Sequence, residues 1–307
     1  MSVTQTTFEK DFTRVPKDLA SSQKINRISL SYRQGVIRTL KQNKVAMISL
    51  GFIILIILAA IFGPILLPNY YHEDLMNTLK APDAINWLGT DNLGRDVLTR
   101  LLRGTRVSLT IGVIAESINL VIGALYGGIS AYLGGKIDII MMRIVDILVS
   151  IPQMIIMILL LTVMGGGVGT LLFALTVTGW TGLARMVRGQ VLSLRENEYA
   201  LAAQVLGASK WEILVTHLLP NTVGPILVNY TMSVPGAIGA EAYLSYLGLG
   251  IAIPEASWGN MLSLGSSQFP SSLWLFFAPA VVFGLTMLAF NLFGDGLRDA
   301  LDPKMRR

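Results

Sequence analysis

The sequence contains no cysteine, only two histidines and little charge. Without cysteine among its 307 residues, the chain can form no disulfide, no Cys-ligated zinc site and no thiol nucleophile. His72 and His217 lie far apart and lack metal-ligand spacing, so we predict neither a metal site nor a catalytic histidine. Charged residues make up 14% of the chain, against about 25% in soluble domains, and 52% of it is apolar. This composition predicts a polytopic membrane protein.

Nucleotide-binding and hydrolytic motifs are also missing from the sequence. The pattern G-x4-G-K-[S/T], whose backbone amides cradle phosphates, does not occur, because Gly134-Gly135-Lys136 is followed by Ile137 and lacks the upstream glycine. No Ser/His/Asp set or carboxylate pair recurs outside the apolar runs at usable spacing. We therefore expect no catalytic residue, no cofactor and no enzyme activity in this chain. Any ATP must bind to another subunit.

Long apolar runs predict an all-α protein with six transmembrane helices. A span needs about 20 apolar residues to cross about 30 Å of hydrocarbon, and Val45–Leu67 supplies 23 residues without a charge. The uncharged stretch 147–184 is about twice as long as a span, so it must fold back at the glycine-rich turn 164–169. The other spans are predicted at 107–133, from Ile139 onward, around 219–243 and around 273–293.

The distribution of basic residues predicts the orientation of the chain. Nineteen of the 24 Lys and Arg residues fall in the two tails and in alternate loops, and the other five fall between Lys80 and Arg106. By the positive-inside rule both termini are expected in the cytoplasm. The basic charge of the N-terminal tail is then explained by anionic lipid headgroups at the membrane surface, and we expect no nucleic-acid partner. The predicted segments are a cytoplasmic tail 1–44, a first span 45–67, an outer loop 68–106 with an amphipathic helix, a five-helix core 107–293 that includes an inner loop 196–220 and an outer loop 244–272, and a cytoplasmic tail 294–307.

The inner loop begins with a predicted amphipathic helix. Its sequence is ENEYALAAQVLGASKWEILVTHLLPN, from Glu196 to Asn221. Tyr199, Ala202, Ala203 and Leu206 recur at i, i+3, i+4 and i+7, which is the spacing of one helical face. Gly207 follows at once and is suited to a left-handed helix C-cap.

A second helix is predicted directly after that glycine. Ser209 and Glu212 have the spacing of a capping box, and Pro220 either interrupts the helix or starts the next span. The pair could be a helix-turn-helix DNA reader, a connector lying on lipid, or an element that docks into a partner's groove. The acidic charge of the segment argues against phosphate binding, and its alanine-rich face favours docking over the lipid connector.

The same segment resembles the EAA loop of ABC importer permeases, whose pattern is EAA-x3-G-x9-I-x-L-P. Ala202, Ala203, Gly207 and Pro220 stand at matching spacing, while Leu201 replaces the acid of the pattern. Glu198 lies one helical turn earlier and is a candidate replacement for that acid. The resemblance implies a loop that couples the chain to an ATPase, through Glu198, Tyr199, Ala202, Ala203, Gly207, Ala208, Ser209, Glu212 and Pro220.

Three further stretches resemble the peptide/nickel branch of these permeases, and within it the C-type subunit of oligopeptide or dipeptide importers. They are 87–109, 134–152 and 247–262. The resemblance implies the type I ABC importer permease fold and a multi-pass location in a bacterial cytoplasmic membrane. It also implies a heterodimer with a second homologous permease, two cytoplasmic ATP-binding subunits and an extracellular or periplasmic peptide-binding protein. The translocated cargo would be di- or oligopeptides, with nickel or another small solute as the alternative.

The outer segment 90–103 has the spacing of an exposed amphipathic helix. Thr90 or Asp91 can serve as its N-cap, and Asp91 with Arg95, like Asp96 with Arg100, falls at i, i+4. A plain interfacial helix is one interpretation. The resemblance implies another, a seat for the external binding protein formed by Asp91, Leu93, Arg95, Asp96, Arg100 and Trp258.

Acidic residues in or near the apolar runs must face protein or water, because a charge in the hydrocarbon costs at least about 2.5 kcal/mol. Glu116 and Glu241 are predicted as pore-lining candidates. Asp138, Arg143 and Asp146 are predicted to anchor the second and third spans at the inner face. A self-sufficient secondary transporter using Glu116 or Glu241 is the alternative function, although no inverted repeat of broken helices is visible.

Overall fold

The computed structural model describes residues 32–67, 69 and 71–301, and within these the regular structure is helical except for one isolated bridge between Thr90 and Asp96. This confirms the all-α fold class. The helices are α2 (Tyr32–Gln42), α3 (Lys44–Leu66), η2 (Leu75–Asn77), α4 (Val97–Leu133), α5 (Gly135–Ser150), α6 (Gln153–Met164), α7 (Val168–Arg195), α8 (Glu198–Val205), α9 (Lys210–Glu212), the π-turn η3 (Ile213–Leu218), α10 (Leu219–Tyr246), α11 (Trp258–Ser267) and α12 (Leu273–Leu301).

Four of the described helices are long and apolar enough to cross a membrane, namely α3, α4, α7 and α12. The count rises to five when α5 and α6, which bend by 75° at their junction, are taken as one broken span. The junction falls at Pro152, and proline disfavours helical backbone at the residue before it. The predicted count of six is therefore not confirmed, since α10 is not among these spans. The predicted turn between α6 and α7 does occur, at Gly165–Gly167.

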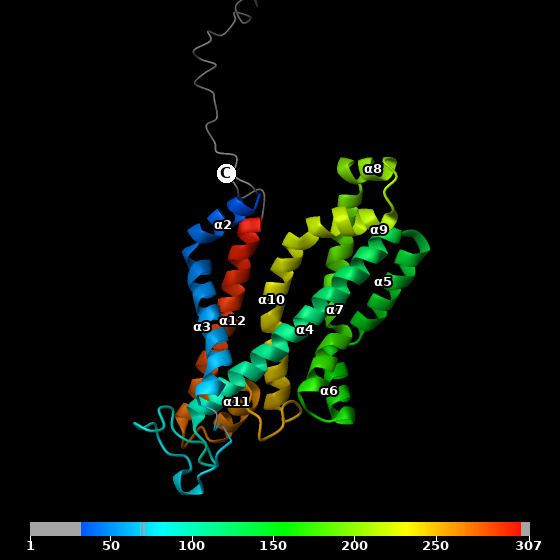
Figure 1. The fold of residues 1–307 in the computed structure, drawn as a ribbon. Coiled ribbons are helices and arrows are strands. Elements are labelled where there is room, and N and C mark those ends of the chain that lie inside the picture. The colour runs from blue at the N-terminus through cyan, green and yellow to red at the C-terminus, as the bar shows by residue number, and fades with distance from the viewer. Residues whose placement is uncertain (1–31, 68, 70, 302–307) are drawn as a thin grey trace, which may run out of the picture.

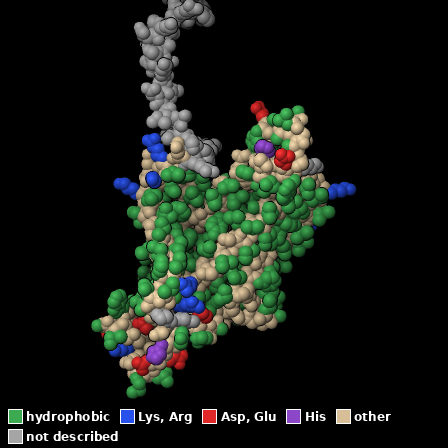
Figure 2. All heavy atoms as spheres, viewed as in Figure 1, with side chains coloured by type: hydrophobic (Ala, Val, Ile, Leu, Met, Phe, Trp, Pro, Cys, Tyr) green, Lys and Arg blue, Asp and Glu red, His purple; other side chains and the backbone are tan. Residues whose placement is uncertain are grey.

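Figure 1 shows that the molecule has two distinct ends. Helices α8 and α9 lie at one end, which we call the α8 end, together with α2 and the last turns of α12. Helix α11, helix α6 and the loop 69–96 lie at the other, which we call the α11 end. Between the ends the surface in view is mostly apolar (Figure 2), and α3 exposes large apolar side chains such as Ile48, Leu55 and Leu66. Such a surface is suited to lipid contact.

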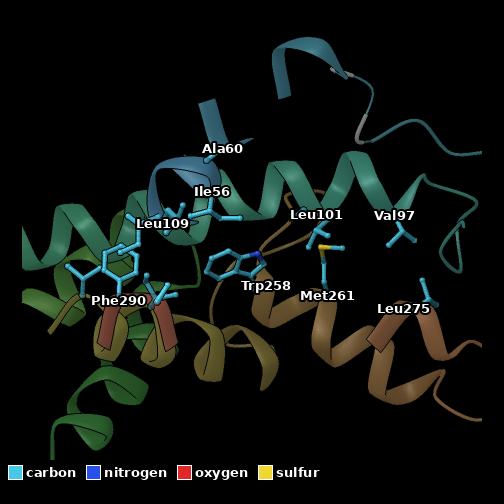
Figure 3. Close-up of a cluster of buried hydrophobic side chains, with 14 residues drawn as sticks. Ile56, Ala60, Val97, Leu101, Leu109, Trp258, Met261, Leu275 and Phe290 are labelled. Carbon is cyan, nitrogen blue, oxygen red and sulfur yellow. The ribbon is translucent and has the colours of Figure 1, made fainter. Parts of the chain in front are cut away.

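A hydrophobic core at the α11 end joins α3, α4, α11 and α12. Trp258, the first residue of α11, is fully buried among side chains of these helices (Figure 3). Its indole Nε1 donates to Thr105 Oγ1 of α4 at 3.2 Å, which satisfies the polar atom of a buried ring. Phe283 of α12 meets the indole edge to face at a centroid separation of 5.9 Å. The core therefore fixes α11 against the beginning of α4.

Small residues bring α4 and α7 into close contact. Gly123 and Gly127 lie one turn apart on α4, and a Cβ at Gly127 would collide with the carbonyl group of Ala184 on α7. A Cβ at Gly123 would meet the carbonyl of Trp180 at 2.8 Å. This is the G-x-x-x-G arrangement that lets two membrane helices approach through their backbones.

An arginine of α4 completes the hydrogen bonding of α3. Pro64 lies inside α3 and has no N–H group for the carbonyl four residues earlier, that of Ala60. Arg106 Nε donates to this carbonyl at 2.8 Å, and its Nη2 donates to the carbonyl of Ile61 at 2.6 Å. The charged side chain is thus bound to backbone oxygen atoms, and α3 is tied to α4.

Candidate functional site

The first helix of the inner loop, α8, ends at the glycine that the sequence pointed to. Gly207 has φ +87°, in the left-handed region where glycine avoids a Cβ clash. The N–H of Gly207 donates to the Gln204 carbonyl and the N–H of Ala208 to the Ala203 carbonyl, both at 3.1 Å. These two bonds form a Schellman motif. The predicted C-cap is confirmed, and it fixes the angle between the two helices.

The second helix of the loop continues into α10 without a break. Ser209 Oγ accepts the N–H of Glu212 at 3.2 Å, as expected for a helix start. The chain then passes through the π-turn η3, whose wider turn lets the N–H of Leu219 reach the carbonyl of Leu214. Pro220 sits in the first turn of α10, where a missing N–H is tolerated. Of the two roles predicted for Pro220, it therefore starts α10 and does not interrupt the segment.

The predicted apolar stripe of α8 faces outward except at Ala203. Ala200 and Ala203 are buried, in a cluster that includes Leu218 and residues of α7. Of the four stripe residues only Ala203 is buried, and Tyr199, Ala202 and Leu206 are exposed. Most of the stripe is therefore accessible on the surface of this chain, as a docking face must be. Its role in docking stays a prediction.

Large apolar side chains cover the outward face of this helix pair. Val205 is 87% exposed and Leu206 is 86% exposed. We call the whole group the apolar tip; it consists of Tyr199, Leu201, Val205, Leu206 and Trp211. Glu196, Glu198 and Glu212 are exposed around it. Helix α8, which carries Tyr199, Leu201 and Val205, projects from the α8 end of the molecule (Figure 1).

At the α11 end, the predicted exposed helix 90–103 is wrong in its first half. Residues 90–96 form a loop, and the helix begins at Val97, where Asp96 caps it by accepting the N–H of Thr99 at 2.8 Å. Asp91 is buried and pairs with Arg95 at 2.8 Å and Arg100 at 3.4 Å, measured from each Nε to Oδ2. The charges were expected in water, but the loop folds them against each other.

The residues predicted as a seat are therefore mostly inaccessible. Trp258 is buried like Asp91, Arg95 and Arg100, while Leu93 and Asp96 are half-buried. The side chains that do face outward belong to an earlier part of the loop, and Met76 is 93% exposed. They are Tyr71, Leu75, Met76, Ile85 and Trp87. Sequence reasoning missed them because five scattered apolar residues in a loop carry no periodicity.

An ion pair helps to shape this part of the loop. Lys80 Nζ lies 2.6 Å from Asp83 Oδ2. The side chain of Lys80, followed by the N–H groups of Asn86 and Ile85, lowers the pKa of Asp83 to about 2. The carboxylate thus stays charged at neutral pH and holds the turn at 83–86. Among the described residues, no three His, Asp or Glu side chains are grouped so that they could hold a metal ion.

Glu241, a predicted pore-lining residue, is completely enclosed. Its carboxylate accepts from Ser108 Oγ at 2.7 Å and Ser245 Oγ at 2.8 Å. These hydroxyls in turn accept the N–H groups of Trp258 at 3.2 Å and Ile251 at 3.0 Å. Glu241 therefore joins α4, α10 and the segment before α11, and in this conformation the pore-lining prediction is wrong for it.

Glu116 keeps its place as a candidate for the translocation path. It is half-buried on α4, and Asn119 Nδ2 donates to its Oε1 at 3.2 Å. Its role stays a prediction.

The predicted anchors act through arginines that the sequence did not single out. Asp138 accepts both Nε and Nη2 of Arg188 at 2.6 Å and Ser130 Oγ at 2.6 Å, so it links α5 to α7 and α4. Asp146 pairs with Arg185 at 2.7 Å. The predicted partner, Arg143, is exposed and only reaches Asp146 at 3.9 Å. The contact between Asp138 and Ser130 thus joins α5 to α4, the two spans that the prediction paired, and the two-pronged guanidinium of Arg188 adds α7 to this link.

Comparison with known proteins places this geometry in a family. Residues 119–307 match the sequence model of the inner membrane component of binding-protein-dependent transport systems. The chain belongs to this family. Its residues 31–82 match a second model, the N-terminal transmembrane domain of oligopeptide transport permease C. The two matches cover both the first span and the core of this permease.

Curated relatives resemble the permease over nearly its whole length. The dipeptide transport system permease protein DppC of Bacillus subtilis is 50% identical over 286 residues, which are 92% of this chain and 89% of the relative. The oligopeptide transport system permease protein OppC of the same organism is 46% identical over 297 residues, covering 96% and 97%. OppC of Escherichia coli K12 is 42% identical over 288 residues, covering 93% and 95%.

A solved structure shares the fold of the permease core. The inward-facing MetNI methionine ABC transporter aligns with a TM-score of 0.54 and 22% identity, covering 66% of this chain and 96% of that chain. The predicted family, the C-type permease subunit, and the type I importer fold are confirmed. Family membership favours the permease function over the self-sufficient secondary transporter.

Proposed function

We propose that this chain is one of two homologous permease subunits of an ATP-driven, binding-protein-dependent importer of di- and oligopeptides. The names of its relatives, dipeptide and oligopeptide transport permeases, support the cargo. Two ATP-binding subunits hydrolyse ATP at the α8 end, which is cytoplasmic, and a peptide-binding protein delivers cargo at the α11 end. The chain itself supplies half of the path through the membrane and no catalytic group.

The observation that carries this proposal is the apolar tip. Leu201, Val205 and Leu206 are large exposed apolar side chains on the projecting helix α8 and its C-cap, so water would surround them in the isolated chain. Exposed apolar groups of this kind mark a protein interface. A short amphipathic helix that presents them is suited to a groove on a partner. Because Leu201 stands where the family pattern has an acid, the contact at this position is apolar and does not use an ion pair.

The geometry behind the tip is suited to transmit force. The Schellman motif at Gly207 fixes α8 relative to the second helix, and that helix is continuous with α10 through η3. Ala200 and Ala203 hold α8 against the cluster that contains Leu218. A movement of the ATPase groove is therefore passed to α10 as a rigid displacement.

The test replaces the tip without disturbing the core. Val205→Glu with Leu206→Glu should leave membrane insertion intact, because both side chains are exposed, but should abolish co-purification of the ATP-binding subunits and ATP-driven peptide uptake. Ser193→Glu is the matched control, an exposed position at the end of α7 that lies outside the tip. Normal co-purification and uptake in the double variant would refute the proposal. The cargo is decided by measuring uptake of dipeptides, oligopeptides and nickel ions by the same transporter.

A further inference from the structure

A cavity of about 510 Å³ opens between three helices at the α8 end. This volume lies in the range of small-ligand sites, roughly 300–1,000 Å³. In Figure 1 the last turns of α12 stand apart from the adjoining ends of α10 and α7, and the cavity occupies this region. Its lining residues come from α7, α10 and α12: Met186, Gln190, Pro225, Val228, Asn229, Met232, Arg298 and Leu301.

The lining combines one cation with amides and flexible apolar groups. Arg298 is the only charged residue of the lining, and it forms no ion pair with any residue that the structure describes. The nearby carboxylates Asp295 and Asp299 are exposed and lie outside the lining. A guanidinium fork is well matched to a carboxylate ligand. The thioethers of Met186 and Met232 adapt their shape to different side chains.

The cavity lies on the side of α7 and α10 that is not packed against α4. Ala184 of α7 contacts α4. Met186 comes two residues later, which is about 200° of rotation around the helix, so it lies on the side of α7 that faces away from α4. One turn further from the α8 end on the same faces lie Gly182 of α7 and Gly236 of α10, and a Cβ at either would meet nothing within 4 Å. The open strip therefore continues from the cavity toward the middle of the membrane.

We propose that this cavity binds the C-terminal carboxylate end of a translocated peptide at the cytoplasmic mouth of the path. Arg298 pairs with the carboxylate, Gln190 and Asn229 bond the last peptide group, and the methionines accept the terminal side chain. This arrangement recognises what all short linear peptides share, a free carboxylate, and tolerates what differs among them. The inference rests on the proposed peptide cargo and adds a specific site for it.

The absence of cysteine from the chain makes a direct test possible. Met232→Cys places a reporter in the cavity, Val228→Cys is a second reporter, and Ser193→Cys is an exposed control outside it. The full transporter in inside-out vesicles is labelled with a membrane-impermeant maleimide, with tri-alanine or its C-terminal amide added. Tri-alanine at twice its dissociation constant should slow labelling of the cavity cysteines about threefold. The amide should not protect them, and the control should label at one rate throughout.

Variants of the arginine complete the experiment. Arg298→Gln should remove the protection by tri-alanine, and Arg298→Lys should retain part of it, because a lysine keeps the charge without the fork. Equal protection by the amide, or no protection at all, would overturn the proposal. Protection by added phosphatidylglycerol alone would make the cavity a lipid site and overturn it as well. Uptake of tri-alanine by intact cells is measured separately: if uptake occurs without protection, only this inference fails, and if the wild type takes up no peptide, the proposed function fails.

Discussion

Arg106 and Pro64 lie on different helices and act as a pair. Proline leaves the carbonyl of Ala60 without its helical donor, and the guanidinium of Arg106 supplies one. The same contact also stabilises the charge of Arg106. Its guanidinium donates hydrogen bonds to two carbonyl oxygens of α3, although it lies beside an apolar helix. Each residue would be unfavourable in this place without the other.

We expect Arg106→Ala to destabilise the chain by about 1–3 kcal/mol, since a buried carbonyl loses its partner. In Pro64→Ala with Arg106→Ala, the new N–H at position 64 can bond to Ala60 within α3, so the double variant should be more stable than Arg106→Ala alone. Thermal unfolding of the detergent-purified transporter measures both. Strictly additive losses would show that the two residues are not coupled.

At the scale of residues, the sequence predicts contacts only between groups that are a few residues apart in the chain. The left-handed cap at Gly207 and the hydroxyl of Ser209 act within one helical turn, so local spacing predicts them. The partners of Asp138 and Glu241 cannot be found in this way, because Arg188 is 50 residues from Asp138 and Ser108 is 133 residues from Glu241. Only the packing of α4, α5, α7 and α10 brings these groups together.

At the scale of helices, the close approach of α4 and α7 depends on the absence of side chains. Gly127 leaves room for the carbonyl of Ala184, whereas Gly182, close by on α7, faces open space. The two glycines therefore offer a matched pair. Both lie inside long helices, and only one is packed against a neighbour.

Gly127→Ala should destabilise the chain by about 1–3 kcal/mol, because overpacking forces the two helices apart. Gly182→Ala should be neutral or stabilise it by up to about 1 kcal/mol, since alanine favours the helix and its methyl group meets nothing. Melting temperatures of the two variants in detergent provide the comparison. Equal effects at both positions would contradict the proposed close contact.

The helices themselves could be predicted better than their ends. Uncharged runs predicted α3, α7 and α12 because apolar length alone decides whether a segment crosses lipid. The helical spacing of 90–103 misled because a loop with the same residues can bury its charges against each other, as Asp91 and Arg95 do. The exposed tip was predicted in part, because helical spacing singled out Tyr199 and Leu206, whereas Leu201, Val205 and Trp211 lie off that spacing.

At the scale of the whole molecule, two chemically different ends enclose an apolar middle. The α8 end carries α2, α8 and the end of α12, and the α11 end carries the loop 69–96 (Figure 1). In the described part of the chain, α2, which holds Arg38 and Lys41, and the last turns of α12, which hold Arg298, lie at the α8 end, and this agrees with the orientation that the positive-inside rule predicts. A cytoplasmic location of the α8 end is part of the proposed function.

Single cysteines test this orientation in a chain that has none of its own. In intact cells a membrane-impermeant maleimide should label Met76→Cys on the outer loop and leave Lys41→Cys on α2 unlabelled until the membrane is permeabilised. Both positions are exposed, so access to the reagent depends on the side of the membrane alone. The reverse pattern would invert the proposed topology.

Helix α10 connects the α8 end of the molecule with its α11 end. It continues from the segment that carries Gly207, and near its other end Glu241 and Ser245 bond to Ser108 and to the backbone of Ile251. Mechanically, the loop 196–220 and the segment 247–257 are therefore attached to one continuous helix. Under the proposed function, genetic defects that loosen either attachment should have the same outcome, ATP turnover without import, although the altered residues lie at opposite ends of the molecule.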